Sequence, residues 1–165
     1  MHAPKSILVL CTGNSARSIL AEALFYRLGE GRVSAYSAGS KPKGRPHRMA
    51  LTVLEDKGYD TDFARSKSWT EFEGESAPDL DFVVTVCDSA ASETCPVWPG
   101  APLTAHWGIP DPAAVEEPEA AVREAFEVGY DRLKARVSAY YDIPFSEIDE
   151  AEARKRLKMI GETPI

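Results

Sequence analysis

Hydrophobic residues are arranged along the chain in two alternating patterns, short unbroken runs and longer runs with helical spacing. A short continuous run such as 6–10 is typical of a strand that is buried on both faces of a sheet. Apolar residues that recur every three to four positions, as in 17–31, predict an amphipathic helix that Gly29 or Gly31 would end. Together the patterns predict strands at 6–10, 32–39, 79–87 and 102–107, and helices at 17–31, 45–59, 117–141 and 145–161.

The alternation of strands with helices predicts an α/β fold of three layers, in which helices cover both faces of a four-stranded parallel sheet. In such a sheet ligands bind at the carboxyl ends of the strands. Cys11 and Cys87 both follow strands at those ends, and the loop that contains Asp111 follows the last strand. The sequence therefore predicts a functional site at this edge.

The length of 165 residues suits one domain with a substantial core. We assign 1–141 to that domain and 142–165 to a C-terminal helical extension, for which Ser146 and Asp149 both offer an N-cap. No apolar run is long enough to span a bilayer, and the first apolar segment is typical of a strand and not of a signal peptide. We therefore expect a cytoplasmic protein.

The net charge and the cysteine content disfavour some classes of function and favour others. The net charge of −7 disfavours nucleic acid as a partner, because phosphate contacts need a basic face. A small anion remains a suitable ligand, provided that its site creates a positive field locally. The odd number of cysteines, three, argues against a disulfide framework and favours a catalytic or redox role.

The segment CTGNSARS, 11–18, joins the first strand to the first helix. Backbone N–H groups in such a turn can cradle an oxyanion, helped by the helix dipole, and Arg17 would add a bidentate cationic fork. The same positive field would lower the pKa of Cys11 and make its thiolate a nucleophile. Gly13 permits close approach of the backbone, and Asn14 tolerates a left-handed conformation. The alternative is that Cys11 is a small buried side chain and Arg17 a surface residue.

This loop resembles the Cys-x5-Arg-Ser loop of low-molecular-weight protein tyrosine phosphatases and of the arsenate reductases that share their fold. The resemblance covers roughly 5–140 and includes YSAG at 36–39 and PDP at 110–112. It implies a flavodoxin-like sheet, with Cys11 as the nucleophile, Arg17 binding the oxyanion and Asp111 as the general acid on a mobile loop. It further implies that the oxyanion is bound and the loop supported by the following residues: Thr12, Gly13, Asn14, Ser15, Ala16, Ser18 and Ser37.

The assignment of Asp111 also has a chemical reason. Expelling hydroxide or alkoxide from phosphorus or arsenic needs a proton donor opposite the nucleophile. The alternative is a turn residue, because the PDP segment favours turns in any case.

Cys87 and Cys95 distinguish a reductase from a phosphatase. They lie eight positions apart, and a relay of thiols can carry electrons by successive attack on sulfur, whereas a phosphatase needs one cysteine. The segments CDSAASETCPVWPG and HWGIPDPA are similar to those of the arsenate reductase branch. The alternatives are a core position for Cys87, with Cys95 incidental, or a metal-binding pair, for which the spacing is unsuitable. We interpret His106 as structural.

The surroundings of the predicted cleft also favour a small inorganic anion. The segment 40–49 contains no aromatic residue, and Ala113 stands where the phosphatases usually have tyrosine. We thus expect arsenate reduction without a bound cofactor or metal, coupled to an external thiol reductant, thioredoxin or glutaredoxin with glutathione. A tyrosine phosphatase is the second hypothesis, and a non-catalytic oxyanion-binding protein or thiol redox sensor is the third.

The chain departs from the family pattern in three places. The last two cysteines of the thioredoxin-coupled members are seven positions apart, not eight, and some members have a further cysteine where Ala16 stands. Several members hold a potassium ion near the loop, partly by an aspartate. The comparable segment here offers Lys67, whose ammonium group could replace the ion.

Overall fold

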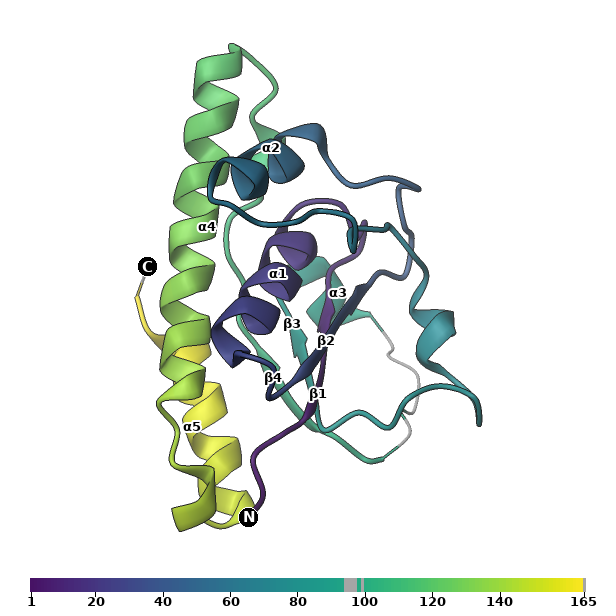
Figure 1. Ribbon diagram of the computed structural model, residues 1–165, viewed down its shortest axis with the longest axis vertical. Coiled ribbons are helices and arrows are strands. Elements are labelled where there is room, and N and C mark those ends of the chain that lie inside the picture. The colour runs from purple at the N-terminus through teal and green to yellow at the C-terminus, as the bar shows by residue number, and fades with distance from the viewer. Residues whose placement is uncertain (94–97, 99, 165) are drawn as a thin grey trace.

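Four parallel strands form a single sheet in the computed structural model, which describes residues 1–93, 98 and 100–164. The strands are β1 (Ser6–Leu10), β2 (Ser34–Ala38), β3 (Phe82–Thr85) and β4 (Leu103–His106), in the order β2-β1-β3-β4 (Figure 1). At the carboxyl edge Leu10 pairs with Ala38 and with Thr85. The segments that follow these strands therefore meet at one edge, and the predicted four-stranded parallel α/β fold is confirmed.

Five α-helices surround the sheet in the part of the chain that the structure describes: α1 (Arg17–Gly29), α2 (Arg48–Asp56), α3 (Asp88–Ser92), α4 (Glu119–Tyr141) and α5 (Glu150–Glu162). Three short 3₁₀ helices accompany them: η1 (Trp69–Phe72), η2 (Pro112–Ala114) and η3 (Phe145–Glu147). The sequence pattern did not predict α3, because a helix of five residues is too short to show a hydrophobic period.

The two faces of the sheet are covered unequally. Ile7 and Val9 of β1 belong to the larger core, together with apolar side chains of α1, α2, α4 and α5. Leu8 and Leu10 belong to a smaller cluster on the other side, where Phe72 of η1 and Trp98 pack. The long helices thus form one thick layer, and among the described residues the helical part of the second layer is the single turn η1 (Figure 1).

Helix α5 packs against the sheet domain along the β4 edge. Ala153, Leu157 and Ile160 are buried in the larger core, and Trp107 Nε1 donates a hydrogen bond of 2.9 Å to the carbonyl oxygen of Leu157. The cap of α5 is Asp149, whose Oδ1 accepts from the backbone N–H of Glu152 at 2.9 Å. The predicted helix therefore starts later than 145, and the division between 1–141 and the extension 142–165 stays a prediction. None of the described helices is long and apolar enough to cross a membrane.

Candidate active site

The loop between β1 and α1 is held in shape by the side chain of Asn14. This residue adopts a left-handed backbone conformation, with φ of 43°, as its sequence position predicts. Its Nδ2 donates to Ser18 Oγ and to Ser37 Oγ, both at 2.9 Å, and its Oδ1 accepts from the backbone N–H of Lys67 at 2.9 Å. The structure thus brings together three of the predicted support residues, two from the loop and α1 and one from the neighbouring strand β2.

A buried ion pair lies beneath this network. Ser37 Oγ donates a hydrogen bond to Glu22 Oε1, and Lys67 Nζ lies 4.0 Å from the same oxygen. Burial raises the pKa of Glu22 to about 7, although Lys67 and the Ser37 hydroxyl oppose the shift. Burial also lowers the pKa of Lys67, an effect that Glu22 opposes. The sequence analysis missed Glu22, and the local signal was a single carboxylate within the apolar run ILAEALF, 19–25.

Arg17, the first residue of α1, reaches across to the loop after β4. Its Nη1 donates to the carbonyl oxygen of Ile109 at 3.0 Å, and its Nη2 lies 3.6 Å from Asp111 Oδ2. Its Nε is buried and has no hydrogen-bond partner among the described residues. A buried donor without a partner is costly, so this atom is suited to an oxyanion ligand. Asp111 caps η2 by accepting from the backbone N–H of Ala113 at 2.9 Å.

The loop surrounds a hollow of about 260 Å³ that also brings in residues from other segments. Its lining consists of Cys11, Thr12, Gly13, Asn14, Ser15, Ala16, Arg17, Lys41, Lys43, Cys87, Ser89, Asp111 and Ala113. No Phe, Tyr or Trp is among these described lining residues, so the hollow offers no aromatic wall for a substrate ring. Its size and polarity suit a small oxyanion.

Lys41 and Lys43 supply the local positive field that an acidic protein needs around an anion site, and the sequence analysis did not single them out. Both belong to a segment fastened to the loop, since their backbone N–H groups donate to the carbonyl oxygens of Thr12 and Gly13 at 3.0 Å. Their side chains are exposed at the rim of the hollow.

We expect replacement of both rim lysines by alanine to weaken the binding of inorganic phosphate about three- to tenfold, because the field that attracts the anion falls. Isothermal titration at several ionic strengths measures this loss, which should shrink as salt rises. The double variant Lys134→Ala/Lys155→Ala changes net charge equally at exposed positions of α4 and α5 and serves as the control. An equal loss in the control would contradict a local effect.

Cys87 lies at the end of the third strand segment and caps α3. Its Sγ accepts hydrogen bonds of 3.4 Å from the backbone N–H groups of Ala90 and Thr12. Cys11 and Cys87 both line the hollow, and each thiol shifts the pKa of the other, so the two side chains lie close together. The structure therefore brings together the nucleophile candidate and the second thiol of the predicted relay. Cys95, the third thiol, lies outside the described residues.

The charge state of the two thiols differs from the sequence-based expectation. The hydrogen bond from Cys11, together with those from Thr12 and Ala90, lowers the pKa of Cys87 to about 5. The hydrogen bond to Cys87 and burial raise the pKa of Cys11, although Arg17 opposes the shift. The pKa of Cys11 is thus raised in this geometry and not lowered as expected, because the interaction with Cys87 and burial outweigh the effect of Arg17.

Removal of the Cys87 sulfur is therefore expected to lower the pKa of Cys11. In the variant Cys87→Ala the largest cause of the upward shift is gone, while Arg17 continues to favour the thiolate. The rate of alkylation of Cys11 by iodoacetamide, followed by mass spectrometry across pH, gives the pKa. The Cys87→Ala variant and the reference protein with Cys87 intact both carry Cys95→Ala, so that the third thiol does not react. An unchanged pH profile of Cys11 would show that Cys87 does not control its protonation.

Helix α3 is fastened at both ends to the surrounding structure. At its start Asp88 Oδ1 lies 2.8 Å from His106 Nε2, while His106 Nδ1 lies 2.7 Å from Thr85 Oγ1. At its end Glu93 Oε1 accepts a hydrogen bond of 2.8 Å from Thr12 Oγ1 in the anion loop. His106 has the structural role that we expected, and Glu93 is a further contact that the sequence did not indicate.

These features define a class of α/β protein in which a strand-to-helix loop with a cysteine and an arginine surrounds a hollow at the carboxyl edge of a parallel sheet. The chain matches the family described as low molecular weight phosphotyrosine protein phosphatase over residues 6–154. It belongs to that family.

The relatives include several proteins named arsenate reductase. The protein of that name from Brevibacillus brevis is 32% identical over 140 residues, which are 85% of this chain and 96% of the relative. That from Staphylococcus aureus is 34% identical over 134 residues, or 80% of this chain and 98% of the relative. The structure described as an arsenate reductase in the phosphate binding state has a TM-score of 0.62 and 25% identity, covering 81% of this chain and 94% of the other.

Proposed function

We propose that this protein reduces arsenate to arsenite, with Cys11 as the nucleophile and with Cys87 and Cys95 as a thiol–disulfide relay. The observation that carries the proposal is that Cys11 and Cys87 line one hollow together with Arg17. A phosphatase requires only one thiol at this place, whereas transfer of electrons to a bound oxyanion requires a second thiol close to the first. The names of the relatives support the same reaction.

In the first step Cys11 Sγ attacks arsenic while Arg17 and the loop N–H groups bind the remaining oxygens. Cys11 gives up its proton to solvent before the attack, and the charge of Arg17 stabilises the thiolate that results. An arsenic–oxygen bond breaks, Asp111 in its acid form protonates the oxygen that leaves as water, and a sulfur–arsenic bond forms. Arsenic keeps its oxidation state in this step.

In the second step the Cys87 thiolate attacks Cys11 Sγ. A sulfur–sulfur bond forms, and the electron pair of the sulfur–arsenic bond passes to arsenic, which leaves as arsenite. The two thiols together lose two electrons and arsenic gains them. Cys95 then attacks Cys87, which frees Cys11 and leaves a disulfide between Cys87 and Cys95. An external thiol reductant, thioredoxin or glutaredoxin with glutathione, reduces this disulfide.

Tyrosine phosphatase activity is the second candidate, because Arg17 and Asp111 lie 3.6 Å apart beside the nucleophile, as phosphoryl transfer also needs. The hollow lacks an aromatic residue among its described lining, which favours a small inorganic anion over an aryl phosphate. We therefore expect at most residual aryl phosphatase activity. A non-catalytic oxyanion-binding protein or redox sensor is the third alternative.

Parallel steady-state assays separate these functions. One measures arsenate-dependent NADPH oxidation, once with thioredoxin and its reductase and once with glutathione, glutaredoxin and glutathione reductase. The other measures phosphate release from p-nitrophenyl phosphate. We expect arsenate-dependent oxidation with at least one reductant system and little phosphatase turnover. Substantial phosphatase turnover without arsenate-dependent oxidation would overturn the proposal, and binding of phosphate with neither reaction would favour the third alternative.

A further inference from the structure

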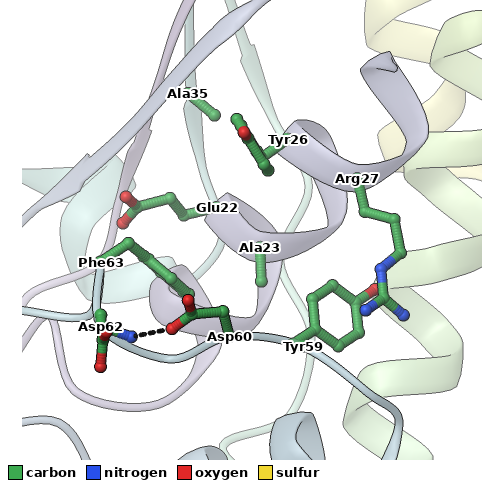
Figure 2. A pocket seen from close by; sticks show the side chains of 9 residues that line it. All are labelled: Glu22, Ala23, Tyr26, Arg27, Ala35, Tyr59, Asp60, Asp62 and Phe63. Carbon is green, nitrogen blue, oxygen red and sulfur yellow. Dashed lines mark hydrogen bonds between the residues drawn. The ribbon is translucent and has the colours of Figure 1, made fainter. Parts of the chain in front are cut away.

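A second pocket, remote from the anion loop in its lining and opposite in charge, lies between α1, β2 and the segment that follows α2 (Figure 2). Its volume is about 460 Å³, larger than the hollow around Cys11 and within the range of small-molecule sites. Its residues are Glu22, Ala23, Tyr26, Arg27, Ala35, Tyr59, Asp60, Asp62 and Phe63. None of these nine residues lines the anion hollow.

The walls of this pocket combine aromatic side chains with a floor of small residues. Tyr26 and Phe63 are 67% and 37% exposed, and they are two of the five large hydrophobic side chains described as exposed. Ala23 of α1 and Ala35 of β2 add small side chains to the lining. Exposed aromatic side chains gathered around one cavity are typical of a binding site and not of scattered surface residues.

The pocket is also preformed. The hydroxyl groups of Tyr59 and Tyr130 are hydrogen-bonded at 2.8 Å, and Arg27 stacks on the Tyr59 ring with its guanidinium carbon 3.2 Å from the ring centre. Asp60 Oδ1 accepts the backbone N–H of Asp62 at 2.9 Å, which fixes the turn at the rim. Figure 2 shows the Tyr59–Arg27 stack at one end and Phe63 with the aspartates toward the other.

The charge of the pocket is negative. Glu22 lines it but is already paired with Lys67, so the unpaired negative charge is that of Asp60 and Asp62, which stand exposed at its rim. Among the ion pairs of the described residues, none involves Asp60 or Asp62. The one cation of the lining, Arg27, is committed to Tyr59 and to the carbonyl oxygen of Lys57, to which it donates at 3.0 Å. The remaining charges therefore favour a cationic ligand.

The carboxylates are not arranged for a bare metal ion, since the described residues include no group of three or more His, Cys, Asp or Glu able to hold one. We propose that this pocket is a second ligand site, which binds a small organic cation: an ammonium or amidinium group on an apolar body. The cation would lie near the carboxylates, and the apolar body would pack between Tyr26, Phe63 and the alanine floor. The proposal does not rest on the reduction of arsenate, although Glu22 of this pocket also accepts the hydrogen bond of Ser37 beneath the anion loop.

The test uses the full chain, saturated with inorganic phosphate so that the anion loop is filled. Benzamidine is the cationic probe, benzamide its neutral analogue of similar shape, and benzoate its anionic counterpart. Chemical shifts of backbone amides are followed by nuclear magnetic resonance during titration with each compound. We expect saturable shifts confined to residues 22–27, 35 and 59–63, with benzamidine binding about tenfold more tightly than benzamide and benzoate not binding.

The double variant Asp60→Asn/Asp62→Asn should weaken benzamidine binding about threefold or more, since both carboxylates at the rim are lost. Both positions are exposed, and an unchanged melting temperature would show that the fold is intact. The control Glu73→Gln/Glu75→Gln removes the same charge from exposed positions outside the pocket. Equal weakening in the control, equal affinity for benzamide, or shifts centred elsewhere would each overturn the proposal.

Discussion

The variant Cys11→Ser is expected to lose arsenate reduction, and any aryl phosphatase turnover, by about four orders of magnitude or more. A serine hydroxyl is a far weaker nucleophile than a thiolate at neutral pH, and no other thiol occupies the centre of the anion loop in the described residues. Initial rates of arsenate-dependent NADPH oxidation and of p-nitrophenol release measure the loss. Retention of a tenth of either rate would refute Cys11 as the nucleophile.

Two control measurements distinguish a loss of catalytic chemistry in Cys11→Ser from a loss of its folded structure. The Cys11→Ser variant should still bind inorganic phosphate, because Arg17 and the loop N–H groups remain, and titration calorimetry tests this. The variant Arg17→Lys keeps the thiol but replaces a fork that reaches both Ile109 and Asp111 by a single point charge. We expect it to weaken phosphate binding and to lower turnover about a hundredfold or more.

The second large effect concerns the relay thiols. Each of Cys87→Ser and Cys95→Ser should lose multiple-turnover arsenate reduction, yet both should keep whatever aryl phosphatase activity Cys11 and Arg17 support. The reason is that phosphoryl transfer needs the nucleophile, the anion loop and an acid, whereas arsenate reduction also needs two further sulfurs. Coupled reductase assays beside p-nitrophenyl phosphate hydrolysis measure this separation.

Trapping of thiols after a single addition of arsenate identifies the step at which each variant stops. Cys87→Ser should stall before arsenite release, and Cys95→Ser should release one equivalent of arsenite and accumulate a disulfide between Cys11 and Cys87. Mass spectrometry of the alkylated protein distinguishes these states. Full turnover in Cys95→Ser would defeat the relay and show that an external thiol such as glutathione resolves the intermediate directly.

The main helices and strands were predictable because their signals are local. The apolar run of β1, the helical spacing of α1 and the long amphipathic pattern of α4 each correspond to an element of the structure. The first and last residues of the helices and strands were predicted less well. Strand β3 covers only Phe82–Thr85 of the predicted 79–87. Helix α2 begins at Arg48, not 45, because His47 caps it by accepting from the backbone N–H of Met49.

The candidate site was predictable in part for a similar reason. Cys11, Asn14 and Arg17 lie within one short turn, so their order along the chain already indicates an anion loop. Ser37 was assigned by resemblance alone, and Asp111 by resemblance together with the need for a proton donor. The structure places Ser37 against Asn14 and Asp111 beside Arg17. Their catalytic and supporting roles stay predictions that the variants above are designed to test.

By itself the sequence determined the alternation of strands and helices, the edge at which the loops gather, and the turn that joins Cys11 to Arg17. Hydrophobic periodicity, glycines and capping residues are features of a few neighbouring positions, so they can be recognised in the sequence without knowledge of the tertiary structure. Only the tertiary structure decided that Glu22 pairs with Lys67, that an acidic aromatic pocket forms beside α1, and that Cys87 and burial raise the pKa of Cys11. These properties depend on burial and on contacts between residues far apart in the sequence, such as Thr12 and Cys87, which are 75 positions apart. A local sequence pattern therefore does not indicate them.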